Sequence, residues 1–249
     1  MDALSVAIIV LGVLVFLWLH FYLQPQYLMS LLQSCFDPLH VLFFHEAKTR
    51  PQSRPRAALT IDDAPTSSSH EILDCLAKHG VRATFFIISS QIPGREDVLR
   101  RMVEEGHELA NHTRFDEPSW RLSTRGFEDS LIHCEQALQP FLPSSPSPPQ
   151  QKWFRPGHGI VTPSLLATCA EHHYRIALGS CFPNEANARS FFQCTNWRIN
   201  ALYLKLRARP GCVVILHDRP WTAPALEASL PTLCSRHALD TLSRLVEEP

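Results

Sequence analysis

Beyond residue 56, apolar segments of strand length alternate with segments of helical periodicity, and this alternation limits the fold more than any other feature of the sequence. The continuous apolar run at residues 83–88 predicts a strand that is covered on both faces. Residues 67–79 have apolar side chains on one face and Gly80 after them, which predicts a helix that ends at the glycine. Repeated strand–helix pairs build parallel sheets or barrels. We therefore expect an α/β fold.

The same patterns place the other elements. Further strands are expected at the apolar segments 40–44 (a peripheral strand), 57–61, 107–110, 153–154, 174–178, 212–216 and 237–241. Further helices are expected at residues 97–105, 124–138, 163–171, 196–207 and 223–235, and a final turn at 242–248. Residues 142–151 are rich in proline and serine, which predicts a surface loop.

The N-terminal segment differs from the rest of the chain because residues 3–23 contain no charged residue. A helix of this length, at about 1.5 Å per residue, can cross the hydrocarbon core of a bilayer. A cleaved signal peptide is the alternative, but a basic start and a small-residue cleavage site are missing. We predict a transmembrane anchor at residues 1–23, a membrane-proximal segment and linker at 24–56, and a folded domain at 57–249. The predicted location is a single-pass membrane protein with that domain lumenal or extracellular.

Composition excludes few functions. With 45% hydrophobic residues, 19% charged residues and a net charge of −1, the chain is globular and has no general electrostatic attraction to nucleic acid. The 8 cysteines show no paired spacing of the metal-binding type. Cys181 and Cys194 would form a disulfide in an oxidising compartment, which the sequence leaves undecided.

Asp62 and Asp63 are adjacent carboxylates that follow a β-prone apolar run, and Pro65 comes shortly after them. The carboxyl ends of strands are where α/β folds place their chemistry. Two carboxylates this close repel each other unless a cation or a proton lies between them. A solvated turn is the alternative and fits these residues equally well.

Other polar clusters fall at the carboxyl ends of later strands. His112 is followed by Asp116, and Arg155 and His217 each come directly after a predicted strand. Each cluster alone is ordinary loop chemistry. Together they would line a single site, because the loops at this end of successive parallel strands lie next to one another.

These residues, in this order, resemble the motifs of the polysaccharide deacetylase family, the NodB-homology domain of carbohydrate esterase family 4. The matching segments are residues 60–65, 83–86, 106–108, 111–113, 154–159 and 216–218. The resemblance covers residues 57–249 and implies a distorted, incomplete (β/α) TIM-like barrel with about seven strands. It also implies a metal-dependent N-deacetylase that acts on an N-acetylated glycan of the chitin or chitooligosaccharide type.

The resemblance assigns roles by position. It implies that Asp62 is the general base, that His217 is the general acid, and that Arg155 orients the base. The implied ligands of a divalent ion, which would be zinc, cobalt or manganese, are Asp63, His112 and Asp116. Amide hydrolysis needs an activated water, a polarised carbonyl and a proton for the leaving amine, and these residue types supply all three.

The sequence departs from the family motifs in three places. Asp116 stands where the family has a second histidine ligand, and the extra carboxylate favours harder ions over zinc. The aspartate that supports the acidic histidine is missing, so either Glu185 or Asp218 is expected to take its place. His158 replaces a tyrosine whose backbone N–H faces the oxyanion in the family.

The leading hypothesis is therefore a hydrolase that removes N-acetyl groups from amino sugars. One alternative is a catalytically inert barrel that binds glycan or a protein partner, which the departures at Asp116 and His158 would suit. Another alternative is hydrolysis of a different non-peptide carbon–nitrogen bond.

Overall fold

The computed structural model describes residues 3–22, 26–45, 54–142, 151–183, 185 and 196–247. Within these residues, one 8-stranded parallel sheet has the order β1–β6–β5–β4–β3–β2–β7, and β8 pairs with β2 outside this path. The strands are β1 Val41–Leu42, β2 Arg56–Ala64, β3 Thr84–Ile87, β4 Glu108–Asn111, β5 Lys152–Phe154, β6 Tyr174–Ala177, β7 Val213–His217 and β8 Ala238–Asp240.

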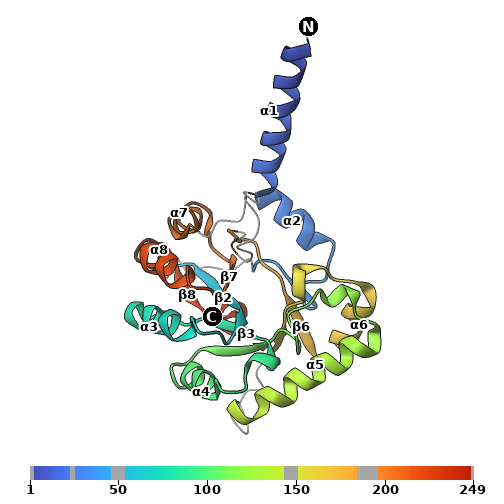
Figure 1. Cartoon of the computed structure of the whole chain (residues 1–249), viewed down its shortest axis with the longest axis vertical. Helices are drawn as coiled ribbons and strands as arrows, with labels where there is room; N and C mark the ends of the chain where they lie inside the picture. Colours follow the sequence, from blue (N-terminus) through green and yellow to red (C-terminus); the bar gives the residue numbers. More distant parts are fainter. Residues whose placement is uncertain are drawn as a thin grey trace.

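The helices α3 to α8 surround these strands on the outside (Figure 1). The helices of the described residues are α1 Ala3–Tyr22, α2 Gln26–Ser34, α3 Ser69–His79, α4 Glu96–Glu104, α5 Thr124–Leu138, α6 Pro163–Glu171, α7 Trp197–Arg207, α8 Thr222–Arg236 and α9 Leu242–Val246. The helices predicted at residues 124–138 and 163–171 have the predicted bounds. The α3 helix ends as predicted, because Gly80 takes the left-handed conformation with φ 62°.

The sheet curves into a barrel that is not closed by a regular strand pair. At its two ends, β1 and β7 are connected by an isolated bridge between Phe44 and Cys212, and a second bridge joins Cys181 to Val214. Gly211 is required at this seam, because a Cβ there would lie 1.8 Å from the carbonyl oxygen of His45. The predicted class, an α/β fold with an incomplete barrel of parallel strands, is thus confirmed.

The strands have an interior and an exterior face because successive side chains of a strand point in opposite directions. In β3, Phe86 joins the interior cluster, whereas Phe85 and Ile87 pack beneath the surrounding helices. Leu242 and Leu245 of α9 belong to the interior cluster, so this short helix fills the barrel from one end. The opposite end, where the strands finish, is left for the polar residues of the site.

The strand predicted as peripheral is β1, which lies at one end of the strand order. Val41 and Leu42 are nevertheless buried, because β1 pairs with β6 and packs within the apolar clusters. Of the proline-rich loop predicted at residues 142–151, residues 143–150 lie outside the described part. Cys194, the predicted partner of Cys181, lies outside it as well.

The apolar N-terminal segment forms the helix α1, which extends away from the barrel in Figure 1. The predicted transmembrane anchor is nevertheless not supported. No helix within the described residues combines the length and the hydropathy that are needed to cross a bilayer.

Candidate active site

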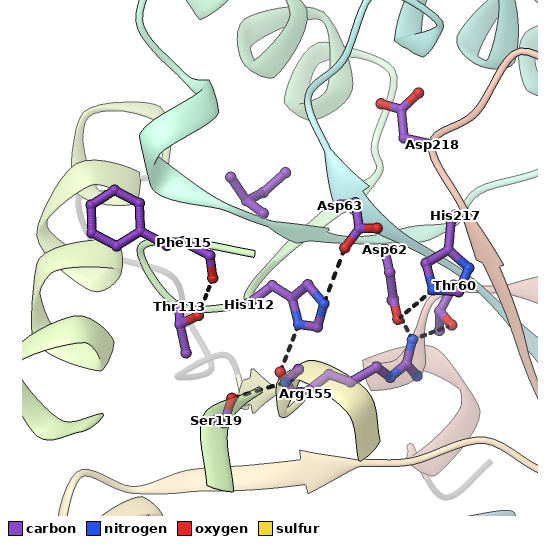
Figure 2. A network of polar contacts seen from close by, with 12 residues as sticks. Thr60, Asp62, Asp63, His112, Thr113, Phe115, Ser119, Arg155, His217 and Asp218 are labelled. Carbon is purple, nitrogen blue, oxygen red and sulfur yellow. Dashed lines mark hydrogen bonds and ion pairs between the residues drawn. The ribbon is translucent and has the colours of Figure 1, made fainter. Parts of the chain in front are cut away.

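Two adjacent aspartates at the end of β2 face the same cavity, which a regular strand would not permit. The reason is the backbone of Asp63, which has φ 62° and lies where the β2–β3 register shifts between Ile61 and Ala64. This left-handed residue breaks the alternation of the strand. Asp62 and Asp63 therefore both point toward the residues that Figure 2 groups at the site.

Asp62 lies between a cation and a histidine. Its Oδ1 accepts a hydrogen bond of 2.5 Å from Arg155 Nη1, and its Oδ2 lies 4.0 Å from His217 Nε2 (Figure 2). The Asp62 and Arg155 side chains are only 4% and 3% exposed, so this is a buried ion pair. The arrangement fixes one carboxylate oxygen and leaves the other directed toward His217.

Arg155 is held from several sides. Its Nε donates to the carbonyl of Ala177 at 2.8 Å, Nη1 also donates to Thr60 Oγ1 at 2.7 Å, and the guanidinium lies 4.1 Å above the Phe86 ring. Burial lowers the pKa of Arg155, although the charge of Asp62 opposes this shift. The predicted contact between Arg155 and the candidate base is thus present, and Thr60 is a contributor that sequence reasoning missed.

His217 is supported by a glutamate from a distant loop. Glu185 Oε1 lies 3.1 Å from His217 Nδ1 and accepts the His217 backbone N–H at 2.6 Å, while Trp221 Nε1 donates to Oε2 at 3.1 Å. Burial would lower the pKa of His217, but the hydrogen bond and the charge of Glu185, with smaller contributions from Asp62 and Asp63, raise it. A raised pKa favours the protonated form that a general acid needs.

The sequence left two candidates for the residue that supports His217, namely Glu185 and Asp218, and the structure distinguishes between them. Glu185 contacts the imidazole, whereas Asp218 lies apart in Figure 2 and accepts hydrogen bonds from the Thr66 backbone and the Ser69 hydroxyl. Asp218 therefore joins β7 to the start of α3 and is a structural residue.

Replacing Glu185 with glutamine is expected to shift the alkaline limb of the kcat/KM profile to lower pH. Glu185 raises the pKa of His217, so removing its charge lowers that pKa, and the protonated acid is then lost earlier as pH rises. The pH profile on an N-acetylated substrate measures this shift. The exposed Glu247→Gln is the control, and an alkaline limb that stays in place in Glu185→Gln contradicts the assignment.

Asp63 and His112 form a second pair beside the first. Asp63 Oδ1 lies 3.4 Å from His112 Nε2, and His112 Nδ1 lies 2.7 Å from the carbonyl oxygen of Arg155, to which it donates (Figure 2). Burial opposes ionisation of Asp63, but the hydrogen bond and charge of His112, with His217 and Arg219, hold the pKa of Asp63 well below its usual value. Burial would lower the pKa of His112, but the hydrogen bond to Asp63 and the negative charges of Asp62 and Asp63 raise it.

This pair fits a metal ion. Metal-binding histidines usually donate one ring N–H to a carbonyl or carboxylate and present the other nitrogen to the ion, as His112 can do with Nε2. Two ligands at about 2.1 Å from one tetrahedral ion lie roughly 3.4 Å apart, and the observed separation of Asp63 Oδ1 and His112 Nε2 is 3.4 Å.

Asp116 is placed differently from the other predicted residues. It lines the same cavity but is exposed, and its carboxylate is not part of a compact ligand group with Asp63 and His112. Arg219 contacts Asp63 instead, with Nη2 donating to Oδ2 at 2.6 Å. Arg219 follows His217-Asp218 in the sequence, and its contact with Asp63 was not predicted from the sequence.

The cavity has a volume of about 490 Å³, within the range of roughly 300–1,000 Å³ that is usual for ligand sites. All six residues that the sequence predicted for the site line this cavity. The loop after β5 lines it as well, through residues 156–159. In that loop, the backbone N–H of Gly157 donates to Ser119 Oγ at 2.9 Å, and His158 is exposed with φ 63°. Only a glycine fits at position 157, because a Cβ would lie 2.2 Å from the carbonyl oxygen of Glu117.

An incomplete parallel barrel that presents three carboxylates, three histidines and a buried arginine in one cavity has the groups that a hydrolase requires. The sequence profile of the polysaccharide deacetylase family matches residues 49–177, which is more than half of the chain. The chain belongs to the polysaccharide deacetylase family. The predicted resemblance is confirmed, and with it the class of a carbohydrate deacetylase that acts on carbon–nitrogen bonds.

Individual relatives agree with the family. The chain is 30% identical over 161 residues to a chitooligosaccharide deacetylase of Bradyrhizobium sp. (strain ANU 289), which covers 64% of this chain and 69% of the relative. It is 29% identical over 209 residues to a chitooligosaccharide deacetylase of Sinorhizobium fredii, with 76% and 92% covered.

Solved structures share the fold. A CE4 family pseudoenzyme from Bacillus anthracis superposes with a TM-score of 0.71 at 17% identity and covers 86% of this chain and 71% of its own. Peptidoglycan deacetylase PdaC from Bacillus subtilis superposes with a TM-score of 0.67 at 24% identity, with 79% and 92% covered. At these identities the similarity concerns the fold alone.

Proposed function

We propose that the protein removes N-acetyl groups from N-acetylglucosamine-type sugars by metal-dependent hydrolysis. The observation that carries the proposal is the meeting of two pairs in one cavity, Asp62 with His217 and Asp63 with His112. Family membership and relatives named for chitooligosaccharides and for peptidoglycan N-acetylglucosamine support this substrate class.

In this proposal, Asp62 is the general base and His217 is the general acid. Arg155 binds Asp62 Oδ1, so Oδ2 is the oxygen that takes the proton of the attacking water. Glu185 holds His217 Nδ1, so Nε2 is directed at the cavity and gives its proton to the leaving amine. Each proton transfer of this kind contributes about 10²–10⁴-fold to the rate.

The metal would be held by Asp63 and His112, and Asp116 would complete the set from its exposed position on the cavity wall. When bound, a divalent ion supplies Lewis acidity toward the acetyl carbonyl and the water. Zinc, cobalt and manganese are the candidates. Because Arg219 binds Asp63 Oδ2, Oδ1 is the oxygen that faces His112 and remains for the ion.

The test is acetate release from chito-oligosaccharides by the purified full chain with added zinc, cobalt or manganese. We expect acetate and free amine in equal amounts, and we expect a chelator to remove the activity. No release with any of the three ions contradicts the proposal. If formamides or cyclic amides are hydrolysed in a parallel panel while the glycans are not, the alternative of another carbon–nitrogen bond is correct.

A glycan-binding barrel without hydrolysis is the second candidate, because Asp116 is exposed and a guanidinium is bonded to Asp63. Metal analysis separates the two. If the protein is a deacetylase, Asp63→Ala is expected to lose one equivalent of ion and all measurable activity. If it is an inert barrel, Asp63→Ala is expected to bind glycan as the unmodified chain does and to have the same metal content.

A further inference from the structure

A second group of metal-ligating side chains lies outside the cavity, between the helices α3 and α8. Cys75 and His79 are four residues apart on α3 and therefore share one helix face, and Glu227 reaches them from α8. One ligand atom from each, namely sulfur, ring nitrogen and carboxylate oxygen, lies within 4.8 Å of the other two. In the described part of the chain, no other group of three or more Cys, His, Asp and Glu side chains meets this criterion.

The two separations that involve Glu227 are close to those around a single zinc-like ion. Glu227 Oε2 lies 3.6 Å from Cys75 Sγ and 3.2 Å from His79 Nε2. Donors at about 2.3 Å (sulfur) and about 2.0–2.2 Å (nitrogen, oxygen) from one tetrahedral ion lie roughly 3.3–3.6 Å apart. The two separations from Glu227 Oε2 are therefore close to those around one ion, and the Cys75 and His79 ligand atoms lie within 4.8 Å of each other.

The surroundings suit an ion that enters from solvent. Cys75 is 7% exposed, whereas the side chains of His79 and Glu227 are 17% and 47% exposed, so the sulfur lies at the floor and the other donors at the rim. Lys78 Nζ donates to Glu227 Oε1 at 2.5 Å, which keeps Oε2 turned toward Cys75 and His79. A thiolate and a carboxylate would balance a charge of 2+, and sulfur with nitrogen favours zinc over harder ions.

We propose that Cys75, His79 and Glu227 bind a divalent ion of the zinc type, with water completing the coordination, and that this ion links α3 to α8. Binding would release the thiol proton of Cys75 to solvent. The α3 helix follows β2 and the α8 helix follows β7, and these are adjacent strands that carry active-site residues. The link is structural, and it does not depend on the proposed hydrolysis.

Cobalt tests this site selectively, because thiolate-bound Co²⁺ has a near-ultraviolet charge-transfer band and no cysteine lines the active-site cavity. The reduced, tag-free full chain is titrated with Co²⁺. We expect the band to develop within the first two equivalents, because the proposed active site also takes cobalt. We expect zinc to abolish the band, because zinc binds such sites more tightly. Zinc is also expected to raise the Tm of the unmodified chain.

Variants make the result specific. Cys75→Ser is expected to abolish the band and to reduce the zinc-dependent rise in Tm. In the Asp63→Ala background, where the proposed active-site ion is lost, it is expected to abolish that rise. His79→Gln keeps the thiol and is expected to weaken cobalt binding by at least about tenfold. Two controls, Cys169→Ser in α6 and Asp63→Ala in the active site, should retain the band. A band that is absent from the unmodified chain, or that persists in Cys75→Ser, overturns the proposal and leaves a purely hydrogen-bonded cluster.

Discussion

The Asp62→Asn substitution is expected to lower kcat/KM for an N-acetylated glycan by about a thousandfold, within the range of 10²–10⁴ for a general base. Asparagine keeps the shape of the side chain and can still accept the hydrogen bond from Arg155, but it cannot take a proton from water. The expected loss is in kcat, since the substitution leaves the cavity wall in place. Steady-state kinetics with the preferred ion measure it.

The matched control for this prediction is Asp218→Asn, a buried carboxylate at the end of the adjacent strand that bonds Thr66 and Ser69. We expect it to reduce the Tm and to leave kcat/KM within a fewfold of the unmodified chain. Near-normal activity in Asp62→Asn, with metal content intact, contradicts the role of Asp62. An equal loss in both variants would show that burial of a carboxylate, and not base catalysis, explains the effect.

The Arg155→Met substitution is expected to lower the free energy of unfolding by about 3–5 kcal/mol, the cost of leaving one partner of a buried ion pair without the other. Arg155 and Asp62 are almost completely buried, and the guanidinium also bonds Thr60 and the carbonyl of Ala177. Denaturant unfolding followed by circular dichroism measures the difference.

A double variant separates the ion pair from the loss of packing. Asp62→Leu combined with Arg155→Met removes both charges, and we expect it to recover a large part of the lost stability, because apolar replacement of a whole buried pair is often neutral. The exposed pair Arg82–Asp240 is the control, and Arg82→Met should cost about 0–1 kcal/mol. A cost in Arg155→Met as small as that of the control contradicts the prediction.

The charges of the site are costly to bury and are therefore held by many hydrogen bonds. Arg155 contacts strands β2 and β6 at once, through Asp62 and Thr60 on one side and Ala177 on the other. The same bonds that stabilise the barrel orient the candidate base. Preorganised polar groups of this kind are what a catalytic site needs, since they do not have to reorganise during the reaction.

Much of the fold could be predicted from the sequence because the information is local. The helices at 124–138 and 163–171 and the end of α3 at Gly80 follow from periodicity and from residues with strong preferences at helix ends. The position of Asp62 and His217 at strand ends follows in the same way, since parallel strands present their carboxyl ends on one side. The order of the motifs along the chain identifies the correct family without the tertiary structure.

The arrangement of side chains within the site depends on contacts between residues that are far apart in the sequence, and local sequence patterns do not predict such contacts. Glu185 and His217 are 32 residues apart, and Asp63 and Arg219 are 156 residues apart, so these pairs form only in the assembled sheet, in which β2 lies beside β7. The backbone of Asp63 is left-handed because the β2–β3 register shifts at that residue, and this turns both carboxylates into one cavity.

The sequence by itself therefore determined the elements, the family and the chemical types of the site residues. Tertiary structure decided which of them touch: Glu185 and not Asp218 supports the histidine, Arg219 binds Asp63, and Asp116 stays exposed on the cavity wall. The physical reason is that side-chain preferences act over a few residues, whereas hydrogen bonds and ion pairs between distant loops form only when the strands have been assembled in order.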